Sequence, residues 1–549
     1  MDIFQYPPSK NLDPVTYELI HSRLRHAARE MAMILKRSSH SPIIREMEDF
    51  SCAIFAPGGE SVAQDERIPA QLGAMSLAVQ TCRAEYPDPG DVQPGDAFLL
   101  NHPYMGCMHT PDLNLVMPVF SDGRVVGWAG STAHHVDLGG PTPGTLAPHH
   151  RELFAEGLIF PPIKLYQGGE ENRDLVRMIA ANVREPRGLV ADLRAQHASC
   201  LTGERALLRT MERYGPDQVG AAFAEILDRT ARQTASALAD LDDGEAVRTG
   251  HLDDDGLGSA PVPIRVRLAK TGRALHVDFT GSSPQVDGAL NVPWASTRAC
   301  VAYLVRTMVG LDIPSNDGLL APVTITCPSG TILNPRFPAA VSVRHNTCQV
   351  VADTLIRTAS DLWPARAVAS SSVTFFGLQI GSRSPQTGET AVLMEVVGGG
   401  TGAHDHGRGI DGVDTYMSNV ALLPVEVAET EYSVRILKSE LVEDSSGEGL
   451  LPGGLGICRE YQILDVPQIA TLYCEQAIEE HRPEGVGGGD DARPTRVTIL
   501  GPDGQVVSTA SKTSSSLEPG SIIRVETSGG GGYGPASTAG TTSDMARSS

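Results

Sequence analysis

The chain has 549 residues, a formal net charge of -22 at pH 7 and 41% hydrophobic residues. This length exceeds one ordinary domain and predicts roughly two to four of them, and the hydrophobic share is enough for a sizeable core. The excess of negative charge repels phosphate, so it argues against direct binding to nucleic acid or to an anionic membrane.

The cysteine pattern and the N-terminus bear on the compartment. Nine cysteines are scattered along the chain without a C-x-x-C pair, which favours a reducing compartment over a disulfide framework. The first residues, MDIFQYPPSKNLDP, lack the charged start and apolar core of a signal peptide, and no apolar run has the length of a membrane span. We therefore expect a soluble, cytoplasmic protein.

The N-terminal region begins with a helix signal. Asp13 suits the N-cap and Pro14 the first helical position, and apolar residues then recur at helical spacing from Ile20 to Leu35. Asp49 follows two glutamates, where a carboxylate could face a site, although a solvated acidic turn is the simpler interpretation. Further strands and a helix are expected over the ranges 50–55, 61–63 and 72–86.

Two strand-like segments between Asp96 and Gly140 end in polar side chains: FLLNHPYMGCMHTPDLNLVMPVF and VVGWAGSTAHHVDLGG. Their polar candidates are Asn101, His102, His109, Asp112, His134, His135 and Asp137. Any one of these is more often a hydrogen-bonded structural residue than a ligand. Together they predict a metal centre at strand ends, because imidazole nitrogen and carboxylate oxygen suit zinc, manganese or iron. Three ligands would leave a position for water, and the other groups would orient ligands or move protons.

The composition and the hydrophobic pattern change twice in the middle of the chain. The proline-rich run beyond Gly140 predicts an ordered loop or lid carrying His149, His150 and Glu156, and the stretch 174–242 is helical with a break at Gly215-Pro216. After Asp243 the chain becomes rich in glycine and β-formers. Expected there are a hairpin over 262–283 turning at Thr271-Gly272, helices over 296–311 and 347–361, and strands over 323–326, 371–380, 391–397, 496–500 and 522–528.

These expectations define an α+β class: a multi-layer mixed fold with an N-terminal helix, a metal-bearing strand and loop region, a helical middle and a β-rich C-terminal part. The predicted domains are 1–242 for the metal site and helices and 243–535 for the β-rich region. The tail 536–549 lacks apolar anchors, so we expect it to be disordered.

Several familiar motifs are missing. The glycine clusters GGGTGAHDHG (398–407) and SGGGGYG (528–534) lack the Lys-Ser/Thr ending of a phosphate-binding loop, so we interpret them as tight turns that need positive φ. No G-x-S-x-G nucleophile motif occurs. Cys107 could ligate or attack, but such a cysteine is more often a small buried residue. The sequence therefore predicts no nucleotide site of its own.

The order of several motifs resembles the B-type subunit of the hydantoinase/oxoprolinase family, from about Asp13 to Pro535. The marks are DPVTYELI, EDFSCAIF, NHPYMGCMHTPDLNLVMPVF, AHHVDLGG, EGLIFPPIKL, NVREPR with DLRAQ, VDFTGSS, LNPRFPAAVSVR, GGGTGAHDHGRGIDG, LLPGGLGICRE and SGGGGYG. This resemblance implies a hetero-oligomer with an A-type subunit that binds ATP and magnesium. It also implies a divalent metal (zinc, manganese or iron) on His109, Asp112 and His134.

The resemblance implies an enzyme that opens a cyclic amide, such as a hydantoin, oxoproline or lactam ring, after the partner has used ATP to activate the carbonyl. The metal would activate the attacking water, and His135, Asp137 or Asp49 would manage the proton. Two alternatives remain open: a subunit of an ATP-dependent ketone carboxylase, and a scaffold without chemistry for the A-type subunit. The chain is shorter than the acetone carboxylase counterpart, which favours the hydrolase branch.

The sequence departs from the family pattern at two places. Gln71 stands where many members have a histidine, and Leu450 and Leu451 stand where an arginine is usual before the glycine pair. These departures concern the identity of the substrate more than the fold.

Overall fold

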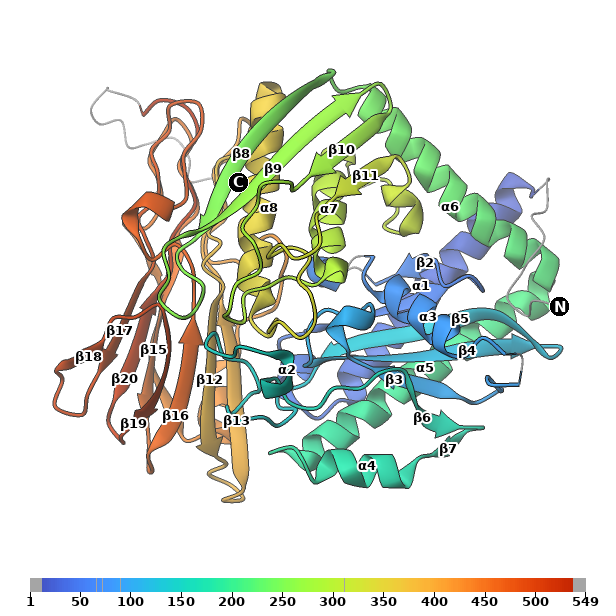
Figure 1. Cartoon of the computed structure of the whole chain (residues 1–549), viewed down its shortest axis with the longest axis horizontal. Helices are drawn as coiled ribbons and strands as arrows, with labels where there is room; N and C mark the ends of the chain where they lie inside the picture. Colours follow the sequence, from blue (N-terminus) through green and yellow to red (C-terminus); the bar gives the residue numbers. More distant parts are fainter. Residues whose placement is uncertain (1–11, 66, 72, 89, 311, 537–549) are drawn as a thin grey trace, which may run out of the picture.

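The computed structural model describes residues 12–65, 67–71, 73–88, 90–310 and 312–536. Segment 1–11 and, apart from Ala536, the predicted disordered tail lie outside these residues. Among the described residues, no helix combines the length and apolar character needed to cross a membrane. The predicted α+β class is confirmed: helices and four sheets are mixed along the chain (Figure 1).

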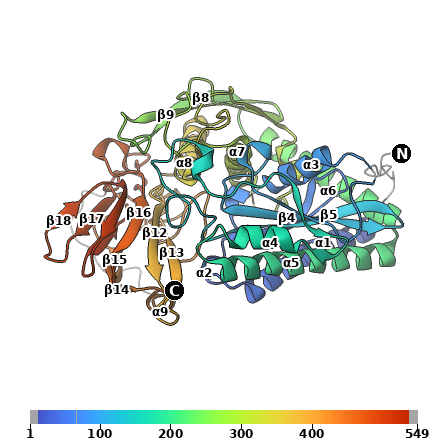
Figure 2. The same ribbon diagram turned by 60° about the horizontal axis from the view of Figure 1, so that its bottom comes forward.

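The N-terminal half is built on a seven-stranded sheet. Its strand order is β2 (Ser61–Gln64), β1 (Phe50–Phe55), β5 (Arg124–His134), β4 (Asp112–Ser121), β3 (Ala97–Leu100), β6 (Ile163–Gln167) and β7 (Glu170–Glu171). Helix α1 (Pro14–Ser38) packs its apolar stripe on β1 and on the long helix α5 (Pro186–Tyr214), which lies along β4 and β5 (Figure 2). Helix α3 (Met75–Glu85) packs on β4 and β5 as well and lies above them in Figure 2. The strand β6 was not predicted, because prolines precede it closely.

The register between β4 and β5 places the first candidate residues. The two strands pair antiparallel, with Ser121 opposite Arg124 at the turn and Asp112 opposite His134 at the other end. Because the hairpin is long, its open end brings together two side chains that are far apart in sequence. The metal candidates therefore lie at the end of the central strands of the sheet.

The helical middle is divided into three helices. Helix α5 ends at Gly215, whose φ of 83° is left-handed, and α6 (Pro216–Ala239) begins directly after it, as the Gly-Pro pair predicted. A second break, between α4 (Arg173–Ala180) and α5, was not predicted.

The predicted cap of the N-terminal helix is present: Asp13 caps α1, and its Oδ2 accepts a hydrogen bond from the Thr16 N–H at 2.9 Å.

A second sheet follows, with the order β11 (Val323–Thr326), β10 (Ala274–Asp278), β9 (Val262–Thr271) and β8 (Gly244–Leu252). It arches over α8 (Arg344–Leu362), beside which lies α7 (Trp294–Val309) (Figure 1). The predicted hairpin is β9–β10, and β8 is an additional strand. The start of α8 lies three residues before the predicted helix, at Arg344, which matters for the site.

The C-terminal third forms two sheets. One has the order β13 (Thr390–Val397), β12 (Phe376–Arg383), β16 (Gln468–Tyr473) and β19 (Lys512–Leu517). The other has the order β14 (Val434–Val442), β15 (Gly456–Ile463), β20 (Ile522–Glu526), β17 (Arg496–Leu500) and β18 (Val506–Ser508), and the short helices α2 (Pro42–Arg45) and α9 (Val425–Glu431) complete the fold. A buried bond from Tyr461 Oη to Glu395 Oε2, 2.8 Å long, joins the two sheets.

The strand predicted from Ser371 begins only at Phe376. The side chain of Ser372 bonds the backbone and side chain of Thr374, and the φ of Phe375 is +33°, which breaks the extended backbone. The main apolar core includes residues from both sides of residue 242, so the layers pack continuously. The domain boundaries at 242 and 535 stay a prediction.

The interpretation of the two glycine clusters as tight turns was wrong. Of their glycines only Gly534 has a positive φ. Apart from Gly407, the others lie where backbone segments approach closely: a Cβ on Gly400 would meet the carbonyl of Gly454, and one on Gly530 would meet that of Thr401. Hydrogen bonds of 2.9 Å from Gly454 N to Thr401 O and from Gly530 N to Gly454 O join these segments, which we call the glycine bundle. Glycine is needed for close backbone packing, as at the crowded axis of collagen.

Candidate metal centre

A pocket opens where the N-terminal sheet meets α8 and the C-terminal sheet. Its cavity volume is about 40 Å³, so the pocket is narrow in this structure. Most polar side chains of its wall come from the start of β4 and the turn before it, the end of β5, the start of α8, and β12 and β16: His109, Asp112, His134, Arg344, His345, Gln379 and Tyr473. Asp49, Gln71, Gln349 and Ser418 complete the polar part. Apolar side chains form most of the remaining wall.

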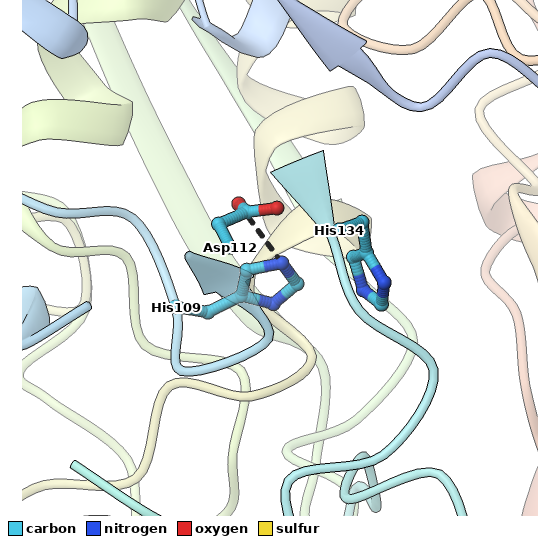
Figure 3. A group of neighbouring side chains, drawn as sticks. All are labelled: His109, Asp112 and His134. Carbon is cyan, nitrogen blue, oxygen red and sulfur yellow. Dashed lines mark ion pairs between the residues drawn. The ribbon is translucent and has the colours of Figure 1, made fainter. Parts of the chain in front are cut away.

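Three side chains in this wall form a compact group. His109 lies in the turn just before β4, Asp112 begins β4 and His134 ends β5 (Figure 3). Their exposed fractions are 3%, 2% and 5%, and one ligand atom from each lies within 4.8 Å of the others. This is the group expected from the H-x-x-D and A-H-H motifs, and it could hold a metal ion.

Hydrogen bonds fix the tautomer of His109. Its Nδ1 lies 2.9 Å from the carbonyl oxygen of Ser342, which can only accept, so Nδ1 carries the proton. Its Nε2 faces Asp112 Oδ2 at 3.0 Å (Figure 3). In neutral His109 these two atoms both carry lone pairs, an arrangement that a cation between or beside them stabilises.

His134 adds a further possible metal ligand. Its Nδ1 is buried and makes no hydrogen bond with the described residues. Burial, together with the nearby His109, lowers the pKa of His134 to about 3, so the ring is neutral near pH 7 and its lone pair is available. Two imidazoles and one carboxylate suit zinc, manganese or iron, so the residues present fit a divalent ion.

The charge of Asp112 is held by its surroundings. Burial alone would raise its pKa, but His109 and Arg344 outweigh burial and lower the pKa of Asp112 below its usual range. The guanidinium of Arg344 donates to Asp112 Oδ2 at 2.9 Å, and both side chains are buried. The carboxylate therefore stays ionised, which is the state that binds a cation.

A buried glutamate shapes the segment behind the site. Glu156 Oε1 accepts from the backbone N–H groups of Val341 and Ser342 at 2.6 and 2.7 Å. Ser342 in turn accepts from His109, so Glu156 positions the segment that orients this ligand. The predicted loop that carries Glu156 thus contributes support from behind, whereas His150 of the same loop bonds Thr142 away from the pocket.

The structure separates the predicted proton-transfer residues. Asp49 lines the pocket, and burial and the negative charge of Asp112 raise its pKa well above the usual range. His135 faces the opposite side of the sheet, where its Nε2 donates to Gln196 Oε1 on α5 at 3.0 Å. Alternation along a strand explains this, since neighbouring side chains point to opposite faces.

Asp137 also lies outside the pocket wall. Its carboxylate accepts from the N–H groups of Gly139, Gly144 and Arg184 at 2.9 to 3.0 Å and from the Arg184 guanidinium at 2.8 Å. With its acceptor sites engaged in this turn, Asp137 has a structural position. Neither His135 nor Asp137 lines the pocket in this structure. Asn101 and His102 likewise bond the local backbone.

Sequence reasoning missed the residues that α8 and the C-terminal sheet supply. His345 packs against Phe375 and Tyr473, with ring centroids 4.5 and 5.1 Å apart, and its buried Nε2 has no partner among the described residues. Gln379 Nε2 donates to Tyr473 Oη at 2.8 Å. The run VSVRH at 341–345 was a signal for the first of these residues, because a cation and an imidazole directly follow an apolar segment.

Backbone strain is concentrated near this pocket. Glu48, Phe375 and Tyr416 have φ values of 61°, 33° and 53°, and each is next to or part of the pocket wall. Such conformations persist only where the surrounding structure enforces them, and they are found preferentially at functional sites.

The sequence is similar to proteins of one known family. The model of the hydantoinase B/oxoprolinase family matches residues 13–536. The chain belongs to the hydantoinase B/oxoprolinase family. Among its relatives, the putative B-type subunit of a D-/L-hydantoinase from Pseudomonas sp. (strain NS671) is 33% identical, over 96% of this chain and 90% of that protein. The 5-oxoprolinase of Dictyostelium discoideum is 30% identical over 95% of this chain, which spans only 40% of that protein.

Two solved structures match the fold closely. The ATP-dependent caprolactamase of Pseudomonas jessenii superposes with a TM-score of 0.89 at 27% identity, over 96% of this chain and 92% of that chain. A nucleotide-free acetone carboxylase superposes with a TM-score of 0.86 at 19% identity, over 95% and 76% of the two chains. At that identity the second similarity concerns the fold alone.

Proposed function

We propose that this family member is the metal-dependent B-type subunit of an ATP-dependent enzyme that hydrolyses a cyclic amide, such as a hydantoin, oxoproline or lactam ring. The observation that carries the proposal is the buried group of His109, Asp112 and His134 in the wall of a pocket between the N-terminal sheet, α8 and the C-terminal sheet. The similarity to a putative hydantoinase component and to an ATP-dependent caprolactamase, over nearly the whole chain, supports the choice of reaction.

The proposal assigns ATP and its magnesium to an A-type partner in a hetero-oligomer. No phosphate-binding loop occurs in the sequence, and the D. discoideum 5-oxoprolinase, of which this chain spans 40%, has room for a second function in the same polypeptide. An unstrained amide carbonyl resists water. Phosphorylation of its oxygen would make the carbon more electrophilic: water would add, the ring C–N bond would break with the nitrogen leaving as the amine, and a second water would hydrolyse the resulting acyl phosphate to the acid and phosphate, which explains why ring opening would need ATP.

The chain's own residues then have defined tasks. A divalent ion at the three ligands would act as a Lewis acid and activate water. Arg344 keeps Asp112 ionised, and the Ser342 carbonyl keeps the Nε2 of His109 directed at the pocket. Asp49, with its raised pKa, holds or accepts a proton at the wall. The apolar remainder of the wall limits access of bulk water to the activated ring.

The test uses the chain co-purified with its A-type partner. We expect ATP-dependent formation of the ring-opened acid from one of hydantoin, 5-oxoproline or a simple lactam, loss of activity after chelation, and recovery with a divalent metal. Labelled bicarbonate is included in the assay, since incorporation of label with a ketone would instead establish a carboxylase. A chain that contains no metal, in a complex that is nevertheless active and needs the chain for its activity, would instead favour a scaffold.

A further inference from the structure

Gln71 is a buried amide without a partner in the pocket wall. It ends the short 3-10 helix η1 (Pro69–Gln71) and is 3% exposed. Its Oε1 is buried and accepts no hydrogen bond, and its side chain makes none with the described residues. A buried amide without hydrogen bonds costs about 1–3 kcal/mol of desolvation free energy, which a ligand with matching hydrogen-bonding groups would offset.

The other two glutamines of the wall differ from Gln71. Gln349 is fully engaged: its Nε2 donates to Thr415 O at 2.8 Å and its Oε1 accepts from Met417 N at 3.0 Å. Gln379 donates to Tyr473 Oη, while its Oε1 is buried without a partner among the described residues. Gln71 differs from both because its side-chain amide makes no hydrogen bond with the described residues at all.

The backbone holds Gln71 in place. Its N–H donates to Ile68 O at 3.0 Å, and the preceding Ala70 N–H donates to Met417 O at 2.9 Å, across the pocket wall. The amide is thus presented by a fixed segment, which reduces the entropy lost when a ligand binds.

The pocket has no spare positive side chain. Among the described residues in the wall, Arg344 is the only lysine or arginine, and it already donates to Asp112. The negative charges of Asp112 and Asp49 both raise the pKa of Arg344. An ion held by the three ligands would attract a ring carbonyl as well as a carboxylate, so the side chains have to discriminate between substrates. A carboxylate substituent placed against this wall would lose water without gaining a cationic side chain.

A ring amide has the complementary shape. The ring forces its amide into the cis form, so the N–H and C=O groups lie on one edge. A glutamine carboxamide presents a C=O and an N–H on one edge as well, so the two can form a pair of parallel hydrogen bonds.

We propose that Gln71 pairs with the cis-amide edge of the entering ring, and that the pocket selects an uncharged cyclic amide with a free N–H over one bearing a carboxylate. This inference rests on the proposed function and narrows its substrate class. Gln71 is here a specificity-determining residue for the ring that binds.

The test compares three five-membered rings: 2-pyrrolidinone, N-methyl-2-pyrrolidinone and 5-oxoproline. With the chain and its A-type partner, ring-stimulated ATP hydrolysis gives KM and kcat for each. We expect KM for 2-pyrrolidinone to be about tenfold lower than for the other two, since one or two hydrogen bonds correspond to about that factor. Gln71→Met should raise KM for 2-pyrrolidinone about tenfold and abolish its advantage over the N-methyl ring, with a smaller change in kcat.

Gln505→Met, the same substitution at an exposed position, serves as the control and should keep all three KM values. Thermal stabilisation of the chain alone by the same rings tests binding without turnover. A preference for 5-oxoproline, or an unchanged preference for the N–H ring over the N-methyl ring in Gln71→Met, would overturn the inference. If no ring stimulates ATP hydrolysis, the proposed function fails, while the thermal shifts still decide the role of Gln71.

Discussion

At the scale of single residues, the site depends on a carboxylate whose charge is maintained in a buried place. Asp112 accepts from Arg344 and faces His109, and each of these contacts is inside the protein. A buried ion pair contributes little net stability when intact, but removing one partner leaves an uncompensated charge. Arg344 is therefore as important to the ligand group as the ligands themselves.

The first prediction concerns this pair. Arg344→Gln should lower the free energy of unfolding by about 3–5 kcal/mol, because it leaves the Asp112 carboxylate buried without its cation. Urea denaturation measures the change. Lys438→Gln, which removes the cation of an exposed pair with Glu440, should leave the urea midpoint nearly unchanged. Equal midpoints for Arg344→Gln and the wild type would contradict this view of the pair.

The second prediction concerns pH. Burial raises the pKa of Glu156 to about 8, although the N–H groups of Val341 and Ser342 act in the opposite direction. Between its ordinary pKa of 4.5 and about 8, the unfolded chain ionises this group while the folded chain keeps it protonated, so stability falls as pH rises through this range. Glu156→Gln keeps an acceptor for both N–H groups and should lose this part of the slope in Tm from pH 5 to 8. An identical slope in both proteins would refute the assignment.

At the scale of elements, the sequence indicated the strands and polar residues that lie on one continuous segment, between Asp96 and Gly140. The two strand-like segments that hold Asp112 and His134 could be recognised in the sequence, and the antiparallel register of the strands places the two side chains opposite each other. Arg344 and His345 could not be assigned in this way, because the packing of α8 against the sheet brings them there from more than 200 residues away. The A-H-H motif does not say which histidine faces the pocket, and it is His135 whose side chain points to the other side of the sheet, toward Gln196.

The third prediction concerns the glycine bundle. A Cβ at Gly530 would collide with the backbone carbonyl of Thr401, which cannot rotate away as a flexible side chain can. Gly530→Ala should therefore lower the free energy of unfolding by about 1–3 kcal/mol or more. Gly90→Ala, where a Cβ meets nothing within 4 Å, is the control and should change Tm little. Similar Tm values for the two variants would argue against close backbone packing as the reason for the glycines.

At the scale of the whole molecule, the site joins both halves of the chain. The ligand group comes from the N-terminal sheet, whereas α8 and the C-terminal strands supply much of the wall. Composition and periodicity predicted the mixed class, but they could not predict that layers so distant in sequence enclose one pocket.

The metal content of the purified chain, measured by inductively coupled plasma mass spectrometry, tests the central claim most directly. The wild-type chain should carry about one divalent ion, His109→Ala should carry none, and His406→Gln, an exposed histidine, should keep the ion. A wild-type chain without metal after growth in metal-supplemented medium, or a His109→Ala chain with the full content, would contradict the account.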